Sequence, residues 1–85
     1  MIRQAIETKY LGATNHRGSR VKARAAAGSI MVEWDHSLDV EKNHIRAAEA
    51  LMIKFGWKAD TLATGEAANG HGYVHVLVKK GQDND

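Results

Sequence analysis

The chain has 85 residues, a formal net charge of +2, no cysteine and no proline. This length supports one hydrophobic core, so we expect a single domain over residues 1–80 and a polar C-terminal tail over 81–85. The lack of cysteine excludes disulfides and thiolate metal sites, and a small domain without disulfides is typical of the cytoplasm.

Hydropathy along the chain predicts no contact with a membrane. No apolar run approaches the roughly 20 residues that a membrane-spanning helix needs. Charged residues at positions 3, 7 and 9 interrupt the N-terminal stretch, where a signal peptide would need an apolar core. We therefore expect neither a membrane span nor a signal peptide.

Basic residues are concentrated in the first part of the sequence. Residues 1–24 contain six basic residues and one acidic residue, whereas the remainder contains six basic and nine acidic residues. This asymmetry favours an anionic partner for the N-terminal part. Basic segments are also common on proteins that bind no nucleic acid, so the asymmetry does not identify the partner.

Three strands are predicted in the N-terminal part. Residues 2–11 mix β-branched and aromatic side chains with polar ones, which favours a first strand, and the polar stretch 12–18 predicts a loop. Residues 19–25 alternate between small apolar side chains and cations, as a second strand with two different faces would. A tight connection over 26–28 leads to a third strand over 30–34.

A helix over about residues 39–55 is the clearest predicted element. Ser37 or Asp39 can cap its N-terminus, and Gly56 suits the left-handed position that follows a helix. His44 falls within the apolar stripe, where we expect a packed, hydrogen-bonded side chain. The stripe comprises Val40, His44, Ala48, Leu51, Met52 and Phe55, with Ala47 beside it.

Two further strands are predicted after the helix, over residues 61–65 and 73–79, with a turn at Asn69-Gly70 between them. The element order is then β-β-β-α-β-β. This order predicts an α+β fold in which one helix packs on one face of an antiparallel β-sheet.

The second predicted strand carries the candidate binding residues. Arg20, Lys22 and Arg24 recur at two-residue intervals, about 6.6 Å apart, and arginine matches phosphate and carboxylate oxygens well. The same alternation is ordinary on the solvated face of a sheet, so both interpretations stay open. The candidate anion- or nucleic-acid-binding residues are Lys9, Tyr10, Asn15, Arg17, Arg20, Lys22 and Arg24.

The sequence predicts no catalytic residues, no cofactor and no metal. Its serines lie in no nucleophile motif, and its glycine loops match no nucleotide-binding pattern. The pair His71 and His75 has a spacing that would suit a metal only in a helix, whereas here it spans a turn and a strand. We therefore expect a protein that is not an enzyme.

Several short pieces of the chain suggest a family. These pieces are Lys-Tyr-Leu at 9–11, Thr-Asn-His-Arg-Gly-Ser-Arg at 14–20 and Phe-Gly-Trp at 55–57, together with His44 and the alanines that follow it. With them the chain resembles short uncharacterised proteins of tailed phages, prophages and bacterial mobile elements, over most of its length through Val78. The resemblance implies that the protein acts in the cytoplasm of a bacterial host cell. It also implies a small accessory protein that inhibits host defence or binds nucleic acid. No established activity is carried over.

Three functions follow as hypotheses. The favoured one is a non-enzymatic phage or mobile-element accessory protein whose basic sheet face binds an anionic surface, either nucleic acid or an acidic patch of a host protein. The second is a protein–protein inhibitor or a homo-oligomeric assembly factor that uses an apolar or strand-edge contact. A homodimer is one such assembly. The third is a small metal-dependent nuclease that uses Asp35, His36 and His44.

Overall fold

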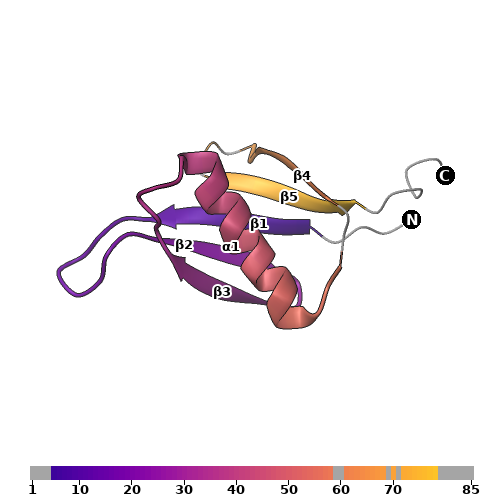
Figure 1. The fold of residues 1–85 in the computed structure, drawn as a ribbon, viewed down its shortest axis with the longest axis horizontal. Coiled ribbons are helices and arrows are strands. Elements are labelled where there is room, and N and C mark those ends of the chain that lie inside the picture. Colours follow the sequence, from indigo (N-terminus) through magenta and orange to yellow (C-terminus); the bar gives the residue numbers. More distant parts are fainter. Residues whose placement is uncertain (1–4, 59–60, 69, 71, 79–85) are drawn as a thin grey trace.

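The computed structural model describes residues 5–58, 61–68, 70 and 72–78. Within these residues one antiparallel five-stranded sheet has the order β3-β2-β1-β5-β4, and one helix crosses it (Figure 1). The predicted α+β fold is therefore confirmed. The elements are β1 (Ala5–Leu11), β2 (Arg20–Ala25), β3 (Gly28–Glu33), α1 (Val40–Phe55), β4 (Thr61–Glu66) and β5 (Gly72–Val78).

The observed bounds of the strands differ only slightly from the predicted ones. The third strand ends at Glu33 rather than at Trp34, and the fifth begins at Gly72 rather than at Tyr73. The predicted first residues of β1, the last residue of β5, Asn69 of the predicted turn and the tail over 81–85 lie outside the described residues.

Both ends of α1 follow the predicted capping signals. The Asp39 carboxylate accepts a hydrogen bond from the Lys42 amide at 2.8 Å, which satisfies one of the free donors of the first turn. At the other end Gly56 has φ 69°, and its amide donates to the Ile53 carbonyl. This left-handed conformation favours glycine because a Cβ would crowd the backbone there.

The first turn of α1 departs from the predicted apolar stripe. Val40 is 53% exposed, so its assignment to the stripe is wrong. The buried side chain at this end is Asn43, whose carbonyl accepts from the Asp35 amide at 2.8 Å and whose amide group donates to the carbonyls of Asp35 and Asp39. These bonds tie the preceding loop to the helix, so apolar burial begins one turn later.

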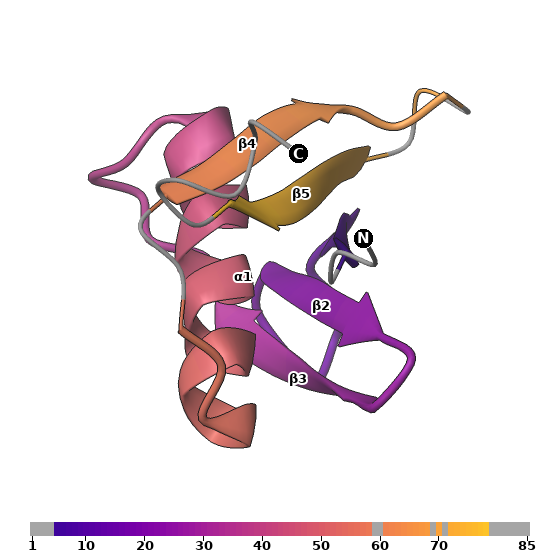
Figure 2. The same cartoon turned by 90° about the vertical axis from the view of Figure 1, so that its right-hand side faces the viewer.

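The core lies between α1 and one face of the sheet. Small residues at the contact let the helix approach β1, β2 and β3 closely, and the helix contacts β5 less extensively. Figure 2 shows α1 on one side of the sheet and no described element on the other side. The buried apolar residues are Ile6, Val21, Ala23, Ala47, Ala48, Leu51 and Leu77.

The helix is also too short and too polar for a bilayer. In the part of the chain that the structure describes, no helix has the length and apolar character needed to cross a membrane.

Candidate functional site

The face of the sheet opposite α1, called the open face below, collects most of the predicted cations. On β2 the buried Val21 and Ala23 point toward the helix, so the alternating cations between them point away from it. Lys9 of β1 lies directly opposite Lys22 on β2. The two neighbouring strands therefore add their basic side chains to the same surface.

One of these cations is neutralised within the sheet. Arg24 lies opposite Glu7 on β1, and its Nη2 donates to the Glu7 carboxylate at 2.8 Å. The two side chains are 67% and 60% exposed, so this ion pair contributes at most about 1 kcal/mol to stability. It places both charges at the middle of the open face.

The central lysines have no such partner. Among the described residues no carboxylate oxygen lies within 4.0 Å of the ammonium groups of Lys9 or Lys22. The residue beside Lys9 on β5 is Gly72, which adds no side chain, and the residue beside Lys22 on β3 is Met31, which adds no charge. A shallow depression of about 450 Å³ lies between these strands and includes both lysines in its lining.

Arg20, the first residue of β2, is the last cation of the basic row at that end of the strand. It lies opposite Glu33 on β3, and its Nη1 donates to the Met31 sulfur at 3.7 Å. Its Nε is buried and has no hydrogen-bond partner in the described part of the chain. Because this Nε is buried, a ligand cannot reach it, and Arg20 would attract an anion through the charge of its guanidinium group.

Three other predicted residues lie elsewhere. Tyr10 lies on the helix side of the sheet, where its ring packs edge-on against Trp34 at 5.1 Å and its hydroxyl is 2.9 Å from the Ser19 hydroxyl. Asn15 and Arg17 are exposed in the β1–β2 loop, which projects beyond the sheet in Figure 1. The structure thus brings together Lys9, Arg20, Lys22 and Arg24, and it separates Tyr10 from them.

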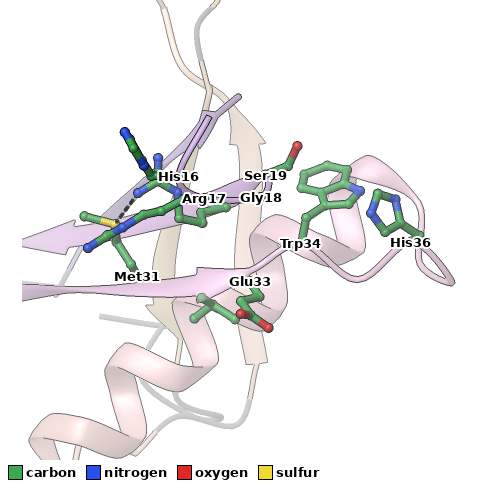
Figure 3. Close-up of a pocket in the computed structure, with 10 residues that line it drawn as sticks. His16, Arg17, Gly18, Ser19, Met31, Glu33, Trp34 and His36 are labelled. Carbon is green, nitrogen blue, oxygen red and sulfur yellow. Dashed lines mark hydrogen bonds between the residues drawn. The ribbon is translucent and has the colours of Figure 1, made fainter. Parts of the chain in front are cut away.

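A second depression, of about 600 Å³, surrounds the ends of β2 and β3. Its lining includes His16 and Arg17 of the loop as well as Trp34 and His36. Figure 3 shows Trp34 and His36 together beyond the end of β3, apart from His16 and Arg17. The polar groups do not converge on one point, so this depression is a weaker candidate for a ligand site than the open face.

A buried polar chain between α1 and the sheet is the main feature that sequence reasoning missed. The Thr8 hydroxyl is 2.7 Å from His44 Nδ1 and 2.9 Å from His75 Nε2, and the Thr64 hydroxyl is 3.0 Å from His75 Nδ1. Thr8 has a single hydroxyl proton, so it can donate to one histidine and must accept from the other. The expectation of a packed, hydrogen-bonded His44 is confirmed. His75 could have been found by its alternation with the buried Leu77.

Burial keeps both histidines neutral at pH 7. Desolvation, with a smaller contribution from the neighbouring His44, lowers the pKa of His75 to about 4. Desolvation also lowers the pKa of His44 from its usual 6.5. The network therefore holds the fold together and presents no charged group to a ligand.

The side chains of the nuclease hypothesis do not assemble into a metal site. His44 is buried against Thr8, while the Asp35 carboxylate accepts bonds from the Ser37 hydroxyl and amide, which hold the pKa of Asp35 below its usual range. Across the described residues no group of three or more metal-ligating side chains is gathered. His71, of the pair with His75, lies outside these residues.

Known proteins offer no template for this chain. Comparisons with protein-family models, with curated proteins and with solved structures each found no match.

Proposed function

We propose that the chain is a small non-enzymatic accessory protein of a phage or mobile element, and that its open face binds an anionic surface. That surface is nucleic acid or an acidic patch of a host protein. The observation that carries the proposal is the cross-strand pair Lys9–Lys22, which lies on a face that no described element covers.

The energetics of this pair support an anion as its partner. Like charges directly opposite each other destabilise a sheet, and apolar or oppositely charged pairs would avoid that cost. A bound anion removes the repulsion and adds attraction to both ammonium groups. Arg20 and Arg24 lie on either side of Lys22 along β2, and because Arg24 is already paired with Glu7, a phosphate or carboxylate row along this strand meets two unpaired cations, Arg20 and Lys22.

The biological setting rests on the sequence resemblance alone. Small accessory proteins of phages and mobile elements act in the bacterial cytoplasm, where nucleic acid and acidic host proteins are both abundant. An inhibitor of host defence that masks an acidic protein surface, or that competes for nucleic acid, would need a basic face of this kind.

The proposal can be tested with the double variant Lys9→Gln/Lys22→Gln on a heparin column. Heparin serves as a polyanion that is neither nucleic acid nor protein. The control is Lys42→Gln/Lys58→Gln, which removes the same two charges from exposed positions away from the open face. We expect the open-face variant to elute at clearly lower salt than the control, with a thermal midpoint at or above that of the unmodified chain. Equal elution of the two variants would mean that overall charge, and not this face, determines anion binding.

A further inference from the structure

The part of the open face formed by β5 and β4, on the side of β1 away from β2, is apolar. Val74, Val76 and Val78 alternate along β5 away from the core. Val76 lies opposite Ala5 on β1 and opposite Ala63 on β4, so one row across three strands carries only apolar side chains. These side chains are half-buried or exposed, and no described element covers them (Figure 2).

The apolar half and the basic half form one continuous surface. Glu7, which pairs with Arg24, lies opposite Val74 on its other side. A depression of about 470 Å³ is lined by residues of both halves, including Ala5, Arg24 and Val74. A partner large enough to contact the cations of β1 and β2 therefore also meets the valines of β5.

This composition distinguishes between the two anionic partners of the proposed function. Interfaces with nucleic acid are strongly polar and basic, and single strands need aromatic side chains for stacking. The described positions of the open face hold no aromatic residue, because Tyr10 and Tyr73 lie on the helix side. Protein interfaces, in contrast, combine an apolar centre with a polar rim.

A second copy of the chain does not fit this surface well. A two-fold pairing would bring either the basic halves of both open faces together, where each copy has four cations and only the carboxylates of Glu7 and Glu33, or lysines against valines. The first arrangement adds like-charge repulsion, and the second removes ammonium groups from water without a counter-charge.

Building on the proposed function, we infer that the partner of the open face is a different protein, whose contact segment presents acidic side chains next to an apolar strip. The acidic side chains meet Lys9, Lys22 and Arg20, while the apolar strip covers Val74 and Val76. Nucleic acid is the alternative partner, and the experiment below decides between it and a protein.

The experiment places a photo-crosslinking amino acid at Ala63, an exposed position in the apolar half, and for control at Ile53, which is 81% exposed on the outer side of α1. Both proteins are illuminated in nuclease-treated lysate of the native host. We expect a protein adduct from position 63 only, mapped to a segment that is rich in Asp and Glu and flanked by apolar residues. The captured protein is then purified, and its affinity is measured for Val74→Thr/Val76→Thr and for Lys9→Gln/Lys22→Gln.

Each double variant should lose about tenfold or more in affinity for that protein, while Ile53→Thr should bind as the unmodified chain does. The inference is overturned if position 63 yields no specific adduct or crosslinks to a second copy of the chain. It is also overturned if mixed-sequence DNA or RNA binds with a steep salt dependence that the valine variants leave unchanged, in which case the proposed function still stands. If the lysine variant binds every partner as well as the unmodified chain does, the proposed function itself fails.

Discussion

At the scale of single residues, the shared hydroxyl of Thr8 explains why two histidines can be buried in so small a core. Both ring nitrogens that face Thr8 are satisfied when one of them donates to the hydroxyl oxygen and the other accepts the hydroxyl proton. A proton added to either histidine would leave a buried charge and turn one acceptor into a donor. The stability of the fold should therefore depend on pH in a range where most small domains are insensitive.

We predict that the free energy of unfolding falls by about 1–2 kcal/mol between pH 7 and pH 5. The pKa of His75 is about 4 in the folded chain, against a usual value of 6.5, so the unfolded chain binds the additional proton between these values. The stabilisation is complete above pH 6.5 and is lost as the pH falls toward 4. Urea unfolding at the two pH values measures the difference.

Two histidine variants separate this effect from general acid sensitivity. His75→Gln removes the titrating ring and should flatten the pH dependence, whatever its effect on stability at pH 7. His16→Gln, at an exposed loop position, should leave the pH dependence unchanged. An unfolding free energy that is equal at pH 7 and pH 5 in the unmodified chain would show that the buried histidines do not carry the proposed linkage.

At the scale of elements, local signals predicted the helix and the two faces of β2, and non-local contacts decided the rest. Asp39 and Gly56 act within one turn of their own positions, so their roles can be read from the sequence. The exposure of Val40 could not be predicted, because it depends on how Asn43 ties the preceding loop to the helix. Tyr10 lies apart from the cations because adjacent residues of a strand point to opposite faces, so it cannot share a face with Lys9.

The apolar stripe of α1 provides a direct test of its packing. Leu51 is completely buried between the helix and the sheet, so Leu51→Ala should cost about 2–5 kcal/mol, a large fraction of the stability of a domain this small. On the same helix, Ile53 is 81% exposed, and Ile53→Ala should change stability by no more than about 0.5 kcal/mol. Thermal or urea unfolding of both variants gives the comparison. Similar losses of stability in the two variants would mean that a different face of α1 packs against the sheet.

At the scale of the whole molecule, the fold class followed from the order of the elements, whereas the order of the strands did not. The first strand lies at the centre of the sheet, between β2 and the last strand β5. The pairing of β1 with β5 joins opposite ends of the chain, and no local pattern encodes it. This pairing places the valines of β5 beside the cations of β1 and β2, so the composite character of the open face emerges only in the folded chain.

The central claim is that anions bind at the open face and not elsewhere on the molecule. It is tested most directly by recording backbone amide NMR spectra while heparin is added to the unmodified chain at low salt. We predict that the largest chemical-shift changes occur at Lys9 and Lys22 and their neighbours on β1 and β2, and that added salt reverses them. Changes concentrated on the outer surface of α1, or an absence of changes on β1 and β2, would contradict the account.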